Sequence, residues 1–362
     1  MDLLRLHCNE SPYGPPIPAV AAAVDELNTS GASYPDSECA DLRKHIARHV
    51  GTSYDTVAVG NGTDELLFLM TLTCAGPGGN VLVTDSTFPG YVNSAAAVGA
   101  VVHTVPMVDN RISASAVIAA MGPDIKVVYI CNPHNPTGTL LPPADVERIV
   151  NAAAEAGAIP VLDEAYMEFV SSEGEYGIDA VKAGRRVVVL RTFSKAWGMA
   201  SLRIGYAVAH PEIIGRLERG RRALPFGVNR LAQSAAAAAL GSEGFIERVR
   251  HRTSEARERL YRGLEAAGIE YVPSVTNFVL VHVAYDSSVV AQRLADDHGV
   301  VVRDLEQFGM PGYLRVTLGT GQQVDRFCSA LVSVLSPLPE EIRRDPVNDP
   351  SDVAVPAAEP AS

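Results

Sequence analysis

One lysine of this chain stands in a sequence suited to holding a phosphorylated aldehyde. Lys195 lies in RTFSKAWGMASLRIGYA (191–207), between a strand-like apolar run and a glycine-containing turn. A partly desolvated lysine amine is nucleophilic and forms an imine with an aldehyde cofactor. Ser194 and Arg203 supply a hydroxyl and a cation for a phosphate monoester beside it. The stretch points to pyridoxal phosphate (PLP), although a Ser-Lys pair alone is equally well explained as a surface lysine.

Two loops that follow apolar runs carry residues suited to a pyridine ring. CNPHNPTG (131–138) is rigid because of its two Asn-Pro pairs, and its Asn135 can donate a hydrogen bond to a ring hydroxyl. In VLDEAYMEF (161–169), Asp163 ends a very apolar run, where a buried carboxylate needs a cationic partner. A protonated pyridine nitrogen is such a partner. Tyr166 follows three residues later, within reach of the ring's phenolic oxygen.

Two other motifs are weaker, because ordinary structure explains each of them on its own. The glycine-rich turn GNGTDE (60–65) can direct backbone N–H groups and Thr63 at an anion, but it also fits a simple capped helix N-terminus. In TFPGY (87–91), Phe88 can cover one face of a planar ring, although a core aromatic is the simpler interpretation. These two motifs support a cofactor site only because they occur in the same chain as the Lys195 motif.

Apolar runs alternate with helical segments throughout the region that carries these motifs. Continuous apolar strands between helices indicate a mostly parallel sheet covered on both faces. Ligands bind such sheets at the carboxyl ends of the strands, and each candidate residue follows a strand. The expected strands are 57–60, 80–85, 101–106, 126–133, 159–166, 186–193 and 205–210, and helices are expected at about 17–28, 36–50, 89–98, 113–121 and 143–156.

The remainder of the chain predicts a smaller α+β domain and a tail. A long helical stretch from about 211 to 267 precedes apolar runs at 278–283, 300–304 and 313–318. The C-terminal segment is rich in proline, acidic residues and alanine, and is expected to be disordered. We therefore expect an N-terminal segment that joins the small domain and the pocket, a large PLP-binding domain, a small C-terminal domain and a tail, at 1–35, 36–250, 251–336 and 337–362.

The composition excludes several classes of protein. The chain has 362 residues, is 47% hydrophobic and carries a formal charge of −12, which argues against nucleic acid as a partner. No apolar run is long enough for a membrane span, and the N-terminus lacks a signal-peptide pattern. The five cysteines have no C-x-x-C spacing, which favours free thiols in the cytoplasm. His45 and His49 lack the glutamate of a zinc motif, so no metal site is expected.

Taken together, the motifs resemble the fold-type I PLP-dependent aminotransferases, and most closely the histidinol-phosphate aminotransferase family. The resemblance covers about residues 6–336 and includes NFVLV and LRVTLGT near its end. It implies an α/β fold, with a large domain around a mostly parallel central sheet and a smaller α+β domain. It also implies PLP as the cofactor, and transamination of histidinol phosphate with 2-oxoglutarate as the reaction.

The resemblance assigns cofactor roles to individual residues. Lys195 is implied to form the Schiff base and to move the proton, and Asp163 to pair with the pyridinium nitrogen. Asn135 and Tyr166 are implied to contact the ring oxygen, and Phe88 to stack on the ring. The residues implied to surround the cofactor phosphate are Thr63, Asp64 (through its backbone N–H), Thr192, Ser194 and Arg203.

It also assigns residues to the substrate and to a partner subunit. Arg315 is implied to bind the substrate carboxylate or an equivalent group, because a guanidinium fork suits a planar anion. Arg303 is implied to lie near a substrate phosphate. An N-terminal stretch with Asn9 and Tyr13 is implied to line the pocket. Tyr34 matches a tyrosine that reaches the neighbouring subunit's cofactor phosphate, which implies a homodimer.

Three departures from the family pattern leave the substrate open. His134 stands where asparagine is common, Ser201 stands where glycine is common, and the chain begins only eight residues before Asn9, without the family's longer arm. An aromatic amino-acid aminotransferase, an aminotransferase of secondary metabolism and a threonine-phosphate decarboxylase relative therefore stay as alternatives.

Two alternatives from other classes are weaker. A ligand-sensing domain fused to a DNA-binding regulator needs a basic helix-turn-helix extension, which neither end of this chain offers. A Rossmann dehydrogenase needs G-x-G-x-x-G after a strand, whereas AGPGGN (75–80) has different spacing and precedes a strand.

Overall fold

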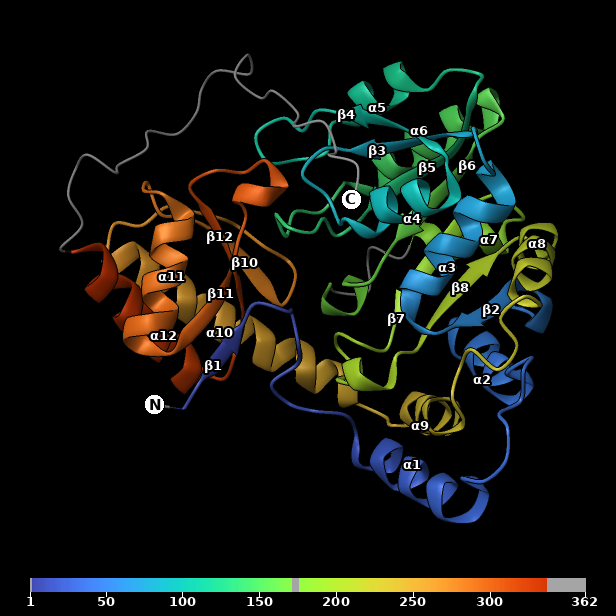
Figure 1. The fold of residues 1–362 in the computed structure, drawn as a ribbon, viewed down its shortest axis with the longest axis horizontal. Coiled ribbons are helices and arrows are strands. Elements are labelled where there is room, and N and C mark those ends of the chain that lie inside the picture. The colour runs from blue at the N-terminus through green and yellow to red at the C-terminus, as the bar shows by residue number, and fades with distance from the viewer. Residues whose placement is uncertain (1, 171–175, 337–362) are drawn as a thin grey trace, which may run out of the picture.

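The computed structural model describes residues 2–170 and 176–336, so the expected tail lies outside the described residues. Within these ranges the strands form two sheets, which lie side by side (Figure 1). The larger sheet has seven strands, in the order β2 (Val57–Gly60), β8 (Gly205–Ala209), β7 (Val188–Thr192), β6 (Ile159–Asp163), β5 (Ile125–Cys131), β3 (Asn80–Thr84) and β4 (Val101–Val105).

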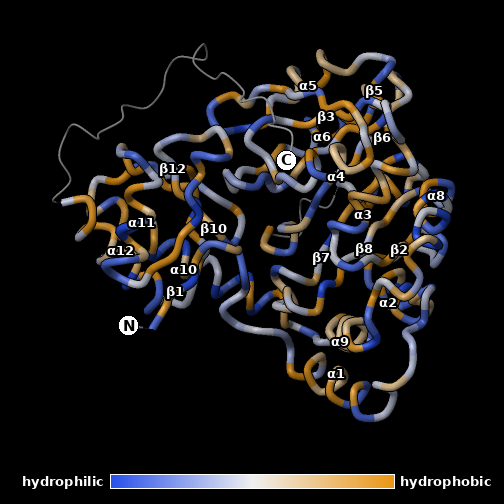
Figure 2. The backbone as a smooth tube through the Cα atoms, viewed as in Figure 1, coloured by the Kyte–Doolittle hydropathy of each residue, from blue (hydrophilic) through white to orange (hydrophobic). Residues whose placement is uncertain are grey.

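The larger sheet is parallel except at one strand. β8 runs antiparallel to both β2 and β7, whereas the remaining pairs are parallel. Both faces are buried, because alternate residues of a strand point to opposite sides. Val57 and Val59 enter one core while Ala58 enters the other. The strands accordingly appear as the hydrophobic centre of this part of the molecule (Figure 2).

Helices cover both faces of this sheet. One core receives side chains from α2 (Ala40–Val50), α5 (Ala114–Ala120), α6 (Pro143–Ala156), α7 (Tyr176–Lys182) and α9 (Arg230–Leu240). The other core receives them from α3 (Gly62–Met70), α4 (Gly90–Val98) and α8 (Pro211–Arg221). A further helix, α1 (Ile17–Ser30), packs on α9 at the edge of the molecule (Figure 1). The expected α/β fold with a mostly parallel central sheet is confirmed.

The helical expectations differ from the structure in two places. The long helical stretch expected from about 211 to 267 is divided into three helices, α8, α9 and α10 (Phe245–Ala266). Pro225 and Gly227 lie in the first break, and Gly244, at φ +67°, ends the second. The helix expected over 36–50 begins only at Ala40, because Asp36 accepts hydrogen bonds from the backbone of Glu38 and Ala40 in a turn.

The smaller sheet is mixed and packs on helices through one face. Its strands follow the order β1 (Leu4–Leu6), β11 (Val300–Asp304), β12 (Tyr313–Thr317), β10 (Phe278–His282) and β9 (Tyr271–Val272). Alternate residues of these strands form a core with α10, α11 (Ser287–His298) and α12 (Gly321–Leu335). The N-terminal strand β1, which was not expected, pairs with β11 and so ties the start of the chain to its C-terminal part.

The helix α10 runs between the two parts of the molecule (Figure 1). Its Val249 packs with residues near the larger sheet, while Leu260 and Leu264 enter the core of the smaller one. The expected boundary between residues 250 and 251 falls within this continuous helix, so the division into domains stays a prediction. Among the described residues, no helix is long and apolar enough to cross a membrane.

Candidate active site

The neighbouring parallel strands β5, β6 and β7 bring three of the sequence motifs to one edge of the larger sheet. Cys131 lies opposite Asp163, and Asp163 lies opposite Leu190, so the three strands end at similar levels. Asp163 is the last residue of β6, and the loops that follow β5 and β7 carry Asn135 and Lys195. The sequence places them there because parallel strands send all their carboxyl ends to the same side.

Asp163 is a buried carboxylate at this edge, with an exposed fraction of 3%. Its Oδ2 accepts a hydrogen bond of 2.7 Å from the Tyr91 hydroxyl, and Oδ1 accepts one of 3.2 Å from the Ala165 amide. Among the described residues no cation forms a salt bridge with it. Burial raises the pKa of Asp163 to about 6, although both hydrogen bonds oppose the shift. A buried acid in this condition is stabilised by an added cation.

Lys195 is the titratable amine of the site. Its Nζ donates a hydrogen bond of 3.0 Å to the Cys8 carbonyl and lies 5.7 Å from the centre of the Tyr166 ring. Burial, together with the charge of Arg315, lowers the pKa of Lys195 to about 8. The amine is therefore neutral in a substantial fraction of molecules near physiological pH, which is the state needed for a nucleophile or a base.

A second group of expected residues surrounds the start of α3. Arg203 donates a hydrogen bond of 3.4 Å to the Ser194 hydroxyl and forms a 2.8 Å ion pair with Asp64. The Thr192 hydroxyl accepts a hydrogen bond of 3.1 Å from the Ser194 amide. The sequence predicted a role for the Asp64 backbone, and the Asp64 side chain additionally binds the arginine.

This cluster has the form of an anion cradle. The first N–H groups of a helix lack intrahelical partners, and here Gly62 and Thr63 begin α3. A Cβ at Gly62 would lie 2.5 Å from Arg203 Nη2, and one at Gly205 would lie 3.0 Å from the Thr63 amide. Glycine at both positions thus lets Arg203 and the Thr63 amide approach the backbone closely, and the donors gathered there, a guanidinium, a hydroxyl and helix N–H groups, suit a phosphate group.

The arginines of the smaller sheet face this edge from the other side. Arg315 donates a 2.6 Å hydrogen bond to Asn135 Oδ1 and one of 2.8 Å to the His7 carbonyl, and it lies over the Phe278 ring. Burial lowers the pKa of Arg315. Asn135 therefore links the two expected parts of the site, the ring contact and the substrate arginine. Arg303 lies directly opposite Arg315 in the β11–β12 pair.

The N-terminal segment crosses between the two sheets at the site. The Asn9 amide group donates a 2.9 Å hydrogen bond to the Tyr166 hydroxyl. Thr317 and Asn277 hold the Asn9 side chain and backbone from the smaller sheet. Tyr13 packs on the cluster that contains Tyr166. Asn9 is buried and adopts φ +54°, so these contacts hold it in a conformation that few residues other than glycine and asparagine adopt.

Two expected residues are less closely tied to the others. Phe88 packs edge-on against Tyr91, with ring centres 5.7 Å apart, and is partly exposed. Tyr34 is 79% exposed and stacks on Phe226 with ring centres 4.8 Å apart, and among the described residues it makes no hydrogen bond to another expected site residue. The family resemblance implied a role for Tyr34 at a partner subunit.

Three residues at the site were not predicted individually. Tyr91 donates to Asp163 and lies three residues after Phe88 in the motif already noted, which was the available signal. The Cys8 carbonyl and Phe278 contact Lys195 and Arg315, and they lie far from both in the sequence. No local pattern identifies such partners.

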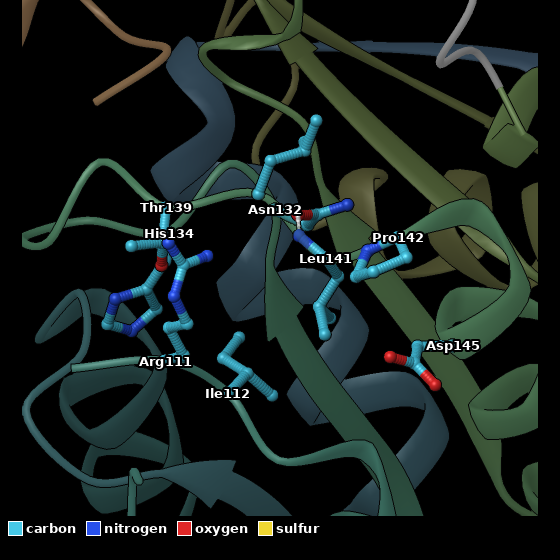
Figure 3. A pocket seen from close by; sticks show the side chains of 9 residues that line it. Arg111, Ile112, Asn132, His134, Thr139, Leu141, Pro142 and Asp145 are labelled. Carbon is cyan, nitrogen blue, oxygen red and sulfur yellow. Dashed lines mark hydrogen bonds between the residues drawn. The ribbon is translucent and has the colours of Figure 1, made fainter. Parts of the chain in front are cut away.

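A separate pocket of about 250 Å³ lies beside the 131–138 loop (Figure 3). None of its lining residues belongs to the expected cofactor or substrate sets, so we assign it no part in the chemistry. His134, one of the departures from the family pattern, borders it and bonds the Thr137 hydroxyl at 2.9 Å. Burial lowers the pKa of His134 to about 3, so its ring is neutral.

Comparison with known proteins decides the family. Residues 1–331 match the family described as aminotransferase class I and II. This chain belongs to that family. The histidinol-phosphate aminotransferase of Moorella thermoacetica is 39% identical over 337 residues, which cover 92% of this chain and 86% of the relative. The corresponding protein of Geobacillus thermodenitrificans is 34% identical, covering 92% and 90%.

A solved structure of this aminotransferase family gives the same result. The crystal structure of histidinol-phosphate aminotransferase from Sinorhizobium meliloti, in complex with pyridoxal-5'-phosphate, has a TM-score of 0.82. It is 32% identical in sequence and covers 92% of this chain and 90% of its own. The expected membership of the fold-type I aminotransferases is therefore confirmed.

Proposed function

We propose that this aminotransferase uses PLP to exchange an amino group between histidinol phosphate and 2-oxoglutarate. The observation that carries the proposal is the pair of opposed groups at one sheet edge: a buried carboxylate, Asp163, without a salt bridge among the described residues, and an amine, Lys195, with a lowered pKa. Names of relatives at 34–39% identity support the choice of substrate.

The residues present fit the cofactor. We propose that Asp163 meets the pyridinium nitrogen and that Arg203, Ser194 and the start of α3 hold the phosphate. PLP supplies an electron sink for the charge that forms when a proton leaves the substrate carbon. Asn135 bonds Arg315 and Tyr166 bonds Asn9, and we propose that Asn135 and Tyr166 orient the ring.

The chain's own chemistry is proton transfer by Lys195. A neutral amine at Nζ takes a proton and returns it at a neighbouring atom, and its lowered pKa allows this cycle near neutral pH. Tyr166 and Cys8 lie against the amine and limit where it can point. Arg303 and Arg315 are proposed to hold the anionic end of the substrate, because neither forms a salt bridge with an acidic residue among those the structure describes.

The direct test is a substrate panel with purified protein and PLP. We expect the amino group of histidinol phosphate to appear in glutamate when 2-oxoglutarate is present, in a ping-pong pattern. Preference for phenylalanine or tyrosine would instead identify an aromatic aminotransferase, and carbon dioxide release from threonine phosphate a decarboxylase. A donor outside both groups would favour secondary metabolism. Failure of amino transfer with every pair would refute the proposed function.

We also propose a homodimer in which Tyr34 reaches the partner's cofactor phosphate. The support is an apolar stripe on α1, made of residues three or four apart and therefore on one helix face. The side chains of this stripe and their exposed fractions are Ile17 (84%), Val20 (47%), Val24 (53%) and Leu27 (56%). Tyr34 and Phe226 are exposed apolar side chains outside the stripe. The hydrophobic colouring of α1 at the edge of the molecule is visible in Figure 2.

Substituting Val24→Asp should dissociate this dimer. In a two-fold dimer each subunit contributes one such aspartate to the interface, and both carboxylates lose their hydration there. We therefore expect the dissociation constant to rise on the order of 100-fold. Sedimentation velocity across a concentration series measures this. Val289→Asp is the matched control, because Val289 is 39% exposed on α11. Equal sedimentation of the two variants would exclude α1 from the interface.

The state of the cysteines supports a proposal for the cellular compartment of the enzyme. All five cysteines are free, and Cys8 is exposed. Free thiols persist where the surroundings are reducing, so we propose that the enzyme acts in the cytoplasm. Oxidant-free purification should leave all five titratable with a thiol reagent after unfolding.

A further inference from the structure

Three basic side chains lie at one level of the smaller sheet. Leu6, the last residue of β1, pairs with Val302 in β11, so His7, which follows β1, lies beside Arg303, the next residue of β11. Arg303 in turn pairs with Arg315 in β12. The three residues come from the two ends of the chain, and the short strand β1 brings His7 to the others.

Arg303 and Arg315 lie on the face of the sheet turned away from its own core, because their neighbours Val302 and Leu314 enter that core and successive strand residues alternate between faces. His7 directly follows β1, and its ring lies close enough to both arginines for their charges to act on it. Arg315 on this face binds Asn135, which follows a strand of the larger sheet. The row His7, Arg303 and Arg315 therefore borders the proposed active site.

The imidazole of His7 is not used by the protein. Its backbone carbonyl accepts a 2.8 Å hydrogen bond from Arg315, a contact that any residue at position 7 would make. Neither ring nitrogen has a hydrogen-bond partner among the described residues; Nδ1 is fully buried, which leaves Nε2 as the accessible nitrogen. A half-buried imidazole in this state has an N–H to offer to a ligand.

The charges of the row suit a dianion. Arg303 and Arg315 carry two positive charges, and no carboxylate in the described part of the chain lies within salt-bridge distance of either. Burial lowers the pKa of His7, and Arg303 lowers it further, although Glu10 opposes this. The ring is thus neutral and contributes a donor without a third charge. A phosphate monoester carries about −1.5 to −2 near pH 7, whereas a carboxylate carries one negative charge.

We propose that His7 is a specificity-determining residue that donates its Nε2–H to the phosphate of a phosphomonoester substrate held by Arg303 and Arg315. The inference rests on the proposed function and sharpens it, because it names the group that selects phosphorylated substrates over carboxylates. A neutral hydrogen bond to a dianion discriminates between the two, since it strengthens with the charge of its acceptor.

The test compares two substrates of the same enzyme. In the PLP-loaded His7→Phe variant, we expect kcat/KM for histidinol phosphate to fall about 30-fold, the effect of one hydrogen bond to a charged group, while kcat/KM for glutamate stays within about threefold. His7→Asn retains an N–H donor and should recover part of the loss. A loss that is equal for both substrates, or no loss for histidinol phosphate, would overturn the assignment.

Arg5→Gln is the matched control. Arg5 is exposed on β1 two residues before His7, and it points to the same side of the sheet. Removing its charge should change both substrates by less than about threefold. If Arg5→Gln reproduces the His7→Phe pattern, long-range charge explains the selectivity and the hydrogen bond does not.

Binding of inorganic phosphate supplies a readout that does not need turnover. Excess phosphate should raise the melting temperature of the PLP-loaded wild-type enzyme more than that of His7→Phe at equal ionic strength. Equal shifts would contradict the role of His7. This measurement separates the two proposals, because it remains informative if histidinol phosphate turns out not to be transaminated at all.

Discussion

Replacing Lys195 with alanine is expected to lower kcat for amino transfer by roughly 10⁴-fold, the upper range for loss of a general acid–base group. The variant loses the only amine at the strand-end cluster, and no neighbour replaces it: the chain has four lysines, and Lys44, Lys126 and Lys182 are exposed. Steady-state rates with histidinol phosphate and 2-oxoglutarate measure the loss. Added PLP should also fail to give the visible absorbance of a lysine-bound cofactor.

The small number of lysines makes the covalent assignment easy to check. Borohydride reduction of the PLP-loaded wild type, followed by peptide mass mapping, should label the Lys195 peptide alone. Lys182→Ala is the matched control, because Lys182 forms an exposed ion pair with Asp179 at the end of α7. Label on another lysine, or activity of Lys195→Ala above a trace, would end the assignment. Circular dichroism checks that both variants fold.

The residues that end parallel strands could be predicted from the sequence. Asp163 and Lys195 follow apolar runs, and a parallel sheet has one carboxyl edge, so their meeting follows from topology alone. The same reasoning placed Asn135 at that edge. Topology does not determine which side chains form hydrogen bonds at that edge. Asn135, for example, bonds Arg315 of the smaller sheet, which is 180 residues away in the sequence.

The contacts made by the N-terminal segment could not be predicted in this way. β1 has three residues, too few for a periodic signal, and it pairs with β11 at the opposite end of the chain. Asn9 bonds Tyr166 and Thr317 across gaps of 157 and 308 residues. The position of His7 could not be predicted for the same reason, because Arg303 and Arg315 become its neighbours only when β1 joins the sheet.

The breaks between α8, α9 and α10 are the opposite case, because the residues that cause them are visible in the local sequence. Pro225 and Gly227 separate α8 from α9, and Gly244 begins α10 in a left-handed conformation. Many helix-forming residues around them favoured one continuous helix. The local breakers prevailed because proline lacks a backbone donor and glycine is the residue best suited to a positive φ.

Replacing Asp163 with asparagine is expected to have opposite effects on the cofactor-free and the PLP-loaded protein. The folded-state pKa of Asp163 is about 6, above the ordinary value of 3.8, so the native state binds the proton more tightly than the unfolded chain. Stability contributed by this group therefore falls as pH rises through that interval, and at pH 8 its cost is on the order of 3 kcal/mol. Asparagine, being neutral, removes the cost.

Cofactor-free Asp163→Asn should thus unfold at higher denaturant concentration than the wild type at pH 8. The two should unfold at about the same concentration near pH 3, below the ordinary pKa of 3.8, where the aspartate is neutral in both the folded and the unfolded chain. With PLP bound the sign reverses. Breaking a buried ion pair costs 3–5 kcal/mol, so we expect kcat/KM to fall on the order of 10²- to 10³-fold. Urea titrations at the two pH values and steady-state kinetics measure the two effects.

The reversal of sign is what separates a cofactor-binding acid from a structural one. A structural carboxylate stabilises the fold with or without PLP, and its loss lowers both quantities. Asp85→Asn is the matched control, because burial also raises the pKa of Asp85, which bonds the Met107 amide at the end of β3. Its effect on stability should be independent of PLP. If Asp163→Asn destabilised the cofactor-free and the PLP-loaded protein equally, the role of the carboxylate would be to accept the hydrogen bonds from Tyr91 and the Ala165 amide, and not to pair with a pyridinium.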